Sequence, residues 1–229
     1  MSLQWIFPAP ILQVDLTPNE KQAGAMKRQL EIFDRLACQS GLNQDKKMLT
    51  GDKLGELGLD RLHHSNSFEW LNHQLGLQVR RLMDELFGID AALDVHIQKA
   101  WPVICDANGG AIRLHTHRNA DLSAIFYIQV ESDNDSGQLA FHAPKHFLNN
   151  YPYASEGELG GGEITIQPKQ HRLILFPSHL DHEVKTYQGK SNRYSISYDL
   201  SITSRRNRGR EMLLQHPSDW LSLSNEERD

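Results

Sequence analysis

Two histidines stand one residue apart in the stretch RLHTHRNADLSAIFYIQ, which runs from Arg113 to Gln129. Alternate residues of a β-strand point to the same face, so a strand that carries His115 and His117 would project both imidazoles together. Neutral imidazole is the commonest side-chain ligand of transition metals. The pair therefore predicts part of a metal site, although a chain with 12 histidines can also contain such a pair by chance.

A second stretch, LILFPSHLDHEVKTYQGKSNRYSISYDL, supplies the remaining parts of such a site. His182 follows an apolar run, and Arg193 opens the next run rich in β-formers. Three protein ligands on one side of a metal leave coordination positions open for substrate and oxygen, as in non-haem iron oxygenases. The planar guanidinium of Arg193 can hold a carboxylate through two charge-assisted hydrogen bonds. We therefore expect a metal site beside an anion site.

Short β-strands must position these side chains. From about residue 94 to residue 203 the chain consists of runs rich in Val, Ile, Tyr and Phe, with Gly, Asn, Asp and Pro between them. These runs are VHIQKAWPVIC, IRLHTH, LSAIFYIQVE, QLAFHAP, EITIQP, RLILFP, EVKTY and RYSISYDLSI. Successive short strands without helices between them indicate an antiparallel sandwich or jelly roll.

Two helices are predicted before these strands. The first has Thr17 as its expected N-cap and Glu20 as the matching capping-box residue. The second covers about residues 67–87 and ends at Gly88. Their apolar stripes are Ala23, Met26, Leu30, Phe33 and Ala37 in the first helix, and Leu71, Leu75, Leu82 and Leu86 in the second. We expect both stripes to cover one face of the sheet.

The predicted fold is mainly β with flanking helices, and its core is a double-stranded β-helix, that is, a cupin-like jelly roll. With 229 residues, 39% of them hydrophobic, the chain can bury one large core, so we expect a single domain. Its parts are a helical flank at 1–93, the β-helix core at 94–203 and a tail at 204–229. The connection 145–162 is longer than usual, and we expect a lid or an insertion there.

Composition narrows the class of protein and its compartment. The net charge of −5 argues against a nucleic-acid partner. The two cysteines, Cys38 and Cys105, form no disulfide framework, which favours a reducing compartment. The chain has no run of eighteen apolar residues and no cationic leader, so neither a membrane span nor a signal peptide is predicted. We expect a soluble cytoplasmic protein, for which a homodimer is possible.

The histidine and arginine pattern resembles that of the Fe(II)/2-oxoglutarate-dependent dioxygenases, a superfamily with a double-stranded β-helix core. The closer resemblance is to a largely uncharacterised, prolyl-hydroxylase-like group of bacterial and phage proteins with an H-x-H, H and R-x-S pattern. The residues that carry it are Phe7 to Ile11, Ala100-Trp101, His115 to Asn119, Ser123, Phe126-Tyr127, Phe176 to Ser178, Leu180, His182, Val184 and Arg193 to Ser197. They extend over nearly the whole chain.

This resemblance implies a function and a role for each matching residue. Fe(II) would be bound by three ligands, His115, His117 and His182. The co-substrate 2-oxoglutarate would pair with Arg193 and would accept hydrogen bonds from Ser195 and Tyr127, while Asn119 either orients a ligand or makes a turn. The implied reaction is hydroxylation of an unidentified small molecule or peptide, with release of succinate and CO2.

Departures from the family pattern leave two alternatives open. The wider superfamily has an aspartate where this chain has His117, so Asp121 is an alternative third ligand if the intervening turn folds back. A cupin-type metal-binding protein, acting as an isomerase or a small-molecule-binding module, would share the barrel and the histidines. Arg193 favours the oxygenase, since a cupin has no requirement for it. Arg118, Ala124 and Asp199 replace a proline, a glycine and an asparagine of the closer group, and we expect these changes to be tolerated.

Overall fold

The structure, a computed structural model, describes residues 9–39, 48–50, 58–88, 93–131, 133–143, 162–204 and 216–221. All of the runs predicted as strands after residue 93 form strands. They are β3 (Leu93–Cys105), β4 (Asn108–His115), β5 (Leu122–Gln129), β6 (Leu139–His142), β7 (Glu163–Ile166), β8 (Arg172–Pro177), β9 (His182–Gln188) and β10 (Arg193–Ser204). The predicted lid at 145–162, apart from Gly162, and most of the C-terminal tail lie outside the described residues.

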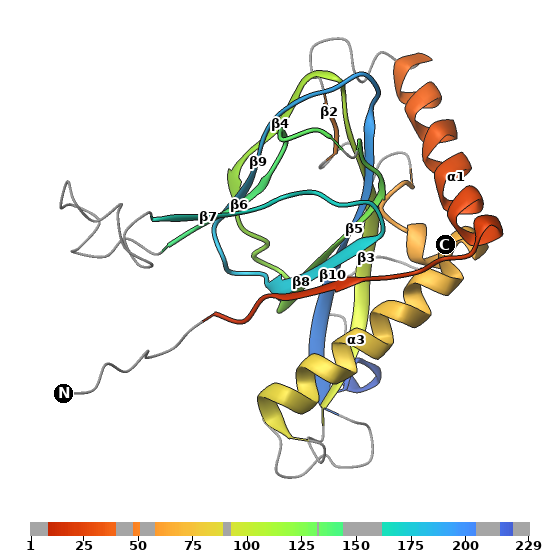
Figure 1. Cartoon of the computed structure of the whole chain (residues 1–229). Coiled ribbons are helices and arrows are strands. Elements are labelled where there is room, and N and C mark those ends of the chain that lie inside the picture. The colour runs from red at the N-terminus through yellow and green to blue at the C-terminus, as the bar shows by residue number, and fades with distance from the viewer. Residues whose placement is uncertain are drawn as a thin grey trace, which may run out of the picture.

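Two antiparallel sheets face each other (Figure 1). The larger has the strand order β1-β8-β5-β10-β3-β2, and the smaller has the order β4-β9-β6-β7. The described residues before β3 add two strands to the larger sheet, β1 (Leu12–Asp15) beside β8 and β2 (Met48–Leu49) beside β3. This arrangement confirms the predicted mainly β jelly-roll class.

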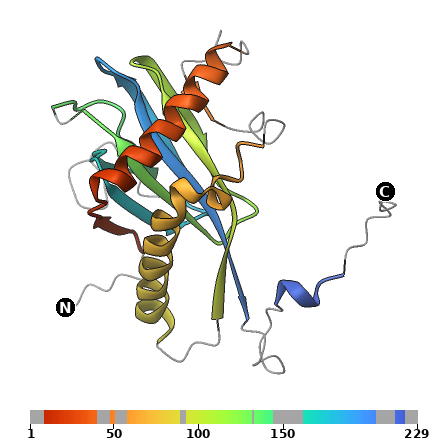
Figure 2. The same cartoon turned by 90° about the vertical axis from the view of Figure 1, so that its right-hand side faces the viewer.

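Two long helices, α1 (Glu20–Gln39) and α3 (Glu69–Phe87), lie against the face of the larger sheet that is turned away from the smaller one (Figure 2). Trp70 meets the ring of Phe126 edge-on, with 6.4 Å between the ring centroids. The hydroxyl of Tyr198 donates to Asn72 Oδ1 on α3 at 3.2 Å. The outer face of the sheet and the two helices thus share one apolar core.

The helices form much as predicted, with two corrections. Met26, Leu30, Phe33 and Ala37 of α1 and Leu71, Leu75 and Leu82 of α3 are buried. Leu86, by contrast, is 43% exposed, and Val79 and Met83 complete the stripe instead. By helical spacing Leu86 lies on the same side of the helix as the buried stripe. It is exposed because it lies in the last turn, just before Gly88 ends the helix.

The predicted N-cap at Thr17 is wrong. Leu16 N–H still donates to His171 O at 2.9 Å, so the chain is bound to the end of the sheet at that point and cannot yet turn into a helix. The capping box is formed by Asn19 and Gln22, each of which accepts a hydrogen bond from the other's backbone N–H at 2.9 Å. Helix α1 accordingly begins at Glu20.

Beyond these two helices, the only helical elements in the described part of the chain are three short 3-10 helices, at Leu62–His64, Asn66–Phe68 and Pro217–Asp219. None of its helices combines the length and the apolar character that crossing a bilayer requires.

The capping box predicts a difference between two similar substitutions. Asn19→Ala should lower the free energy of unfolding by about 1 kcal/mol, because the backbone N–H of Gln22 loses its acceptor. Thr17→Ala, at an exposed position outside the box, should change it by less than about 0.5 kcal/mol. Urea unfolding followed by circular dichroism measures both values. A larger effect at Thr17 than at Asn19 would contradict the corrected helix start.

Candidate metal centre

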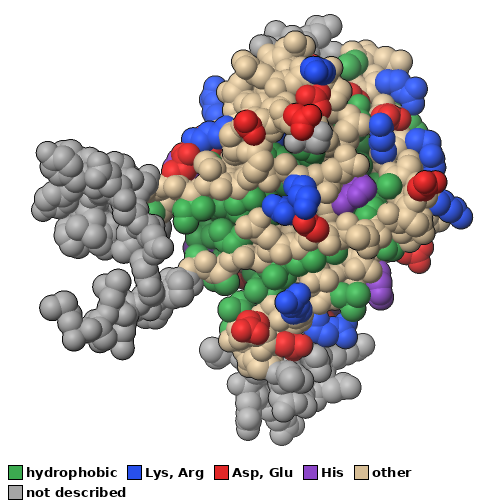
Figure 3. Space-filling model, in the orientation of Figure 1, with side chains coloured by type: hydrophobic (Ala, Val, Ile, Leu, Met, Phe, Trp, Pro, Cys, Tyr) green, Lys and Arg blue, Asp and Glu red, His purple; other side chains and the backbone are tan. Residues whose placement is uncertain are grey.

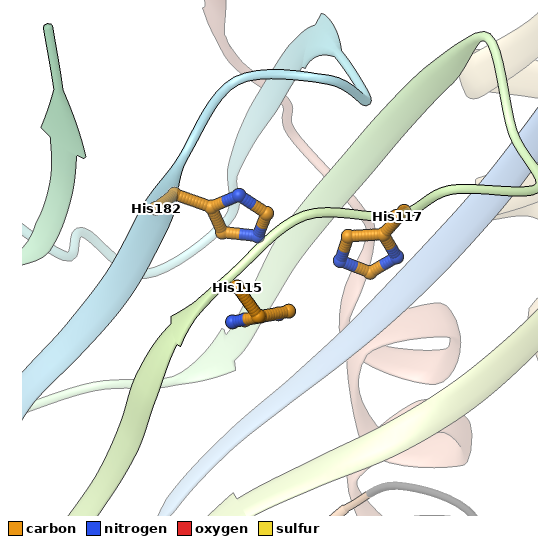
Figure 4. Close-up of side chains that lie close together, drawn as sticks. All are labelled: His115, His117 and His182. Atoms are coloured by element: carbon orange, nitrogen blue, oxygen red, sulfur yellow. The ribbon is translucent and has the colours of Figure 1, made fainter. Parts of the chain in front are cut away.

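Three imidazoles from different parts of the chain converge between the two sheets (Figure 4). His115 is the last residue of β4, His182 is the first residue of β9, and the two face each other in the strand pairing. The ring centroids lie 4.3 Å apart for His115 and His182, 5.1 Å for His115 and His117, and 5.2 Å for His117 and His182. One nitrogen of each ring lies within 4.8 Å of the others, a spacing that one metal ion could bridge.

His117 reaches this cluster from a bend rather than from a strand. We predicted that His115 and His117 alternate along one strand, but β4 ends at His115. The backbone N–H of His117 donates to Ser178 O at 3.0 Å, and this bond holds the bend against the loop that follows β8. The two side chains therefore converge as predicted, through a loop contact instead of strand alternation.

Each imidazole uses Nδ1 in a hydrogen bond that fixes its orientation. Nδ1 of His115 lies 2.8 Å from Arg113 O, and Nδ1 of His182 lies 2.8 Å from Leu180 O. Nδ1 of His117 lies 2.7 Å from Asp199 Oδ1. A carbonyl or carboxylate oxygen can only accept, so Nδ1 carries the proton in all three rings. Nε2 is then left with a free lone pair, as in metal-binding histidines.

The surroundings favour the neutral form of two of these imidazoles, His182 and His115. Burial lowers the pKa of His182 to about 4, an effect only partly opposed by its hydrogen bond to Leu180. Burial likewise lowers the pKa of His115. Neutral imidazole is the form that binds a metal, so these two ligands need not lose a proton first.

Asp121, the alternative third ligand, does not join the cluster. Its Oδ2 accepts from the backbone N–H of Ile202 at 2.7 Å and from Ser201 Oγ at 3.3 Å. The side chain is exposed, and it fastens the loop between β4 and β5 to β10. The structure therefore brings His117, and not Asp121, next to the other two histidines.

Asp199 is a residue of this site that the sequence analysis did not single out. It is 5% exposed and lies opposite Ser123 and Lys99 in the strand pairing. Its Oδ2 lies 3.4 Å from Lys99 Nζ, and its Oδ1 accepts from Ser123 Oγ at 3.5 Å, in addition to the bond with His117. The available signal was strand alternation, since Asp199 shares a face of β10 with Arg193, Ser195 and Ser197.

The predicted anion site at Arg193 is buried and contains an unpaired donor. The side chain is 1% exposed; Nη1 donates to Gly137 O and Nη2 donates to Cys105 Sγ at 2.8 Å. Its Cζ lies 5.6 and 5.5 Å from the ring centroids of Tyr127 and Tyr187. Nε has no hydrogen-bond partner, and among the described residues no carboxylate pairs with this cation. A buried guanidinium without a counter-ion favours an anionic ligand.

The other three predicted co-substrate residues separate into two groups. Ser195 and Tyr127 are paired across β10 and β5, both are buried, and Ser195 Oγ donates to Val103 O at 3.2 Å. They lie next to Arg193 on the inner face of the sheet. Asn119 lies in the exposed turn before β5, close to the histidines and at the opposite end of β10 from Arg193.

A cavity of about 570 Å³ adjoins the histidine cluster, and Arg193, Ser195 and Tyr127 are not among its lining residues. It is lined by all three histidines, and it extends between the sheets to Val103 and Leu139. Val103 is paired with Ser195, so the cavity reaches the strand position two residues from Arg193. Lys99, Trp101 and Asn119 lie on the same wall or at its rim.

Two other groups of side chains have metal-ligand character but lie outside this cavity. His142, Glu163 and Glu183 face outward from the smaller sheet, where Lys185 Nζ already pairs with both glutamates. Asp94, His96 and His216 form a second group, in which Asp94 is exposed and the two histidines are partly buried. A larger hollow of about 1030 Å³, around Glu131 and Lys190, contains none of the three groups.

Comparison with known proteins relates this fold to a family. Residues 99–199 match the family model "Putative 2OG-Fe(II) oxygenase". No curated protein is similar enough in sequence to match. Among solved structures, AviO1 from Streptomyces viridochromogenes Tue57 is 13% identical with a TM-score of 0.54, over 84% of this chain and 90% of its own. HygX from Streptomyces hygroscopicus, solved with nickel and 2-oxoglutarate bound, is 11% identical with a TM-score of 0.51, over 84% and 82%.

These findings decide between the two interpretations of the barrel. The structural matches, all below 25% identity, confirm the jelly-roll fold, and the family match favours the oxygenase over the cupin. The matched segment runs from β3 to β10 and includes the three histidines and Arg193. Residues 99–199, which carry the three histidines and Arg193, are therefore similar to the 2OG-Fe(II) oxygenases, oxidoreductases that use Fe(II) and 2-oxoglutarate.

Proposed function

We propose that Nε2 atoms of His115, His117 and His182 hold the Fe(II) of this oxygenase. The observation that carries the proposal is the set of three Nδ1 hydrogen bonds, which leaves Nε2 as the free ligand atom of every ring. Three ligands on one side leave room in the coordination sphere for 2-oxoglutarate and oxygen. His117 takes the third position, because the carboxylate of Asp121 is bound to the backbone of Ile202.

We further propose that Arg193 anchors the distal carboxylate of 2-oxoglutarate. The unpaired Nε and the absence of a carboxylate partner among the described residues support this role. The neighbouring Ser195 and Tyr127 would add hydrogen bonds, whereas Asn119 lies at the rim and would contact the substrate or shape the entrance. Bound Fe(II) and 2-oxoglutarate supply the oxidising chemistry, in which the substrate is hydroxylated by O2 while 2-oxoglutarate is converted to succinate and CO2.

In this proposal the residues of the chain bind and orient the metal and the reactants, and they exclude water from the site. The strand pairs fix the histidines, and burial between two sheets limits the access of water to the reacting atoms. A cavity of about 570 Å³ is within the size range of pockets that hold small molecules. We propose a small molecule or a peptide side chain as the substrate.

The charge of the surface indicates which partners the protein can have, and the state of the cysteines indicates its compartment. On the face shown in Figure 3, described Lys and Arg side chains are interspersed with Asp and Glu, and the net charge is −5. This supports a protein that acts without a nucleic-acid partner. Cys38 and Cys105 are both free, which supports a reducing compartment such as the cytoplasm.

Metal binding tests the ligand assignment. His182→Ala and His117→Ala should each abolish stoichiometric Fe(II) binding in an anaerobic titration. Each substitution leaves the metal with two of the three protein ligands that occupy one face of its coordination sphere. Asp121→Asn, the matched control, should bind Fe(II) as the unmodified protein does. The reverse pattern, with binding lost in Asp121→Asn and kept in His117→Ala, would make Asp121 the third ligand.

Co-substrate binding tests the anion site separately. Arg193→Gln should weaken 2-oxoglutarate binding by about 2–5 kcal/mol, as expected when one member of a buried charge pair is removed. Arg193→Lys should fall between, since it keeps the charge and loses the planar fork. Calorimetry with Ni(II) in place of Fe(II) measures these affinities, and metal affinity measured alone serves as the control for folding. Unchanged 2-oxoglutarate binding in Arg193→Gln would refute the assignment.

A further inference from the structure

The carboxylate of Asp199 is buried at the metal centre without being one of its ligands. It is 5% exposed and lines the cavity, yet its nearest contact is the proton-bearing Nδ1 of His117 at 2.7 Å, on the side of the ring away from the ligand atom. Burying a carboxylate is costly unless it is paired, so this position requires an explanation. The other groups that face it are Lys99 Nζ at 3.4 Å and Ser123 Oγ at 3.5 Å.

We propose that Asp199 is a positioning residue of the metal centre, one that aligns His117 and supplies through it the negative charge that the three imidazoles lack. This inference rests on the proposed function, since it takes His117 as a ligand. A divalent ion bound by three neutral rings keeps its full charge in a partly enclosed cavity. Asp199 is the only carboxylate of the described residues in contact with one of these rings.

The three ligand histidines are not equivalent in this respect. His115 and His182 donate Nδ1–H to the neutral carbonyls of Arg113 and Leu180. Only His117 donates to a carboxylate. A carboxylate acceptor raises the basicity of the opposite nitrogen and fixes the ring, and removing such a partner typically weakens metal binding by about 10–100-fold. His117 therefore acts as the most electron-rich ligand of the set.

Lys99 opposes this effect. Its ammonium lies 3.4 Å from Asp199 Oδ2 and 4.5 Å from the ring centroid of Trp101. The side chain is 48% exposed, while that of Asp199 is 7% exposed, so Lys99 reaches the carboxylate from the solvent side. Lys99 and His117 contact the same carboxylate, so the positive charge of Lys99 partly neutralises the negative charge that Asp199 offers to His117. Removing Lys99 and removing Asp199 should consequently change metal affinity in opposite directions.

Co(II) affinity of the whole chain, measured by competition with a chelator and followed by the visible absorption of bound Co(II), tests this proposal. Asp199→Ala should weaken binding about 10–100-fold. Asp199→Asn can still accept the proton of His117 but carries no charge, so it should fall between Asp199→Ala and the unmodified protein. Both variants should shift the Co(II) absorption bands, which a purely structural role would leave in place.

Lys99→Met keeps an apolar stem over Trp101 and should tighten Co(II) binding. In the Asp199→Asn background the same substitution should have a smaller effect, because Lys99 acts through the carboxylate. Asp121→Asn is the matched control, since it removes a carboxylate bonded to the backbone of Ile202 and should leave Co(II) affinity unchanged. Urea midpoints of all variants show whether the fold is kept, and Asp199→Asn, nearly identical in size, carries the test if Asp199→Ala fails to fold.

The outcomes separate this inference from the proposed function. Co(II) affinity within about twofold of the unmodified protein in Asp199→Asn and in a folded Asp199→Ala would overturn the positioning role, which predicts a loss of about 10–100-fold. Full affinity in Asp199→Asn with a loss in Asp199→Ala would overturn the charge contribution. Full affinity in His117→Ala would instead overturn the ligand assignment on which the inference rests.

Discussion

Burial of β10 on both faces is the constraint on which the rest of the structure depends. From Arg193 to Leu200 every residue of this strand is buried. Tyr194, Ile196, Tyr198 and Leu200 face the helices, while Arg193, Ser195, Ser197 and Asp199 face the smaller sheet. One strand thus contributes to the apolar core and to the site at once. A shift of its register by one residue would exchange the two sets and destroy both.

On the inner face, the buried polar side chains of Ser195 and Asp199 are stabilised by partners within the fold. Ser195 donates to a backbone carbonyl, and Asp199 has His117, Lys99 and Ser123 around it. Arg193 is the exception, since two of its nitrogens are bonded and Nε is not. Two tyrosine rings offset part of the cost of burying the guanidinium. An anion bound beside the unpaired Nε would lower the remaining cost, which supports the proposed anionic ligand at this point.

The sequence predicted the strands and the site to different extents. The strands after residue 93 were predictable because β-formers and turn residues alternate clearly there. His115 and His117 were singled out from their spacing, His182 from its place in a loop after a strand, and Arg193 from its place at the start of the next strand. The start of α1 was missed because the hydrogen bond of Leu16 to His171 is a tertiary contact. Asp199 was noticed only as a departure from a family pattern, since its bond to His117 joins positions 82 residues apart in number (199 − 117). No local pattern can report such a contact.

Gly137 shows how narrowly the anion site is built. Its backbone has a φ of 72°, and its carbonyl accepts from Arg193. A Cβ atom at this position would lie 2.7 Å from Nη1 of Arg193 and 3.0 Å from the ring of Tyr187. Any side chain here would therefore both strain the backbone and displace the guanidinium from its pocket. The proposed anion site thus constrains evolution at two positions, since Gly137 can vary only if the guanidinium of Arg193 moves with it.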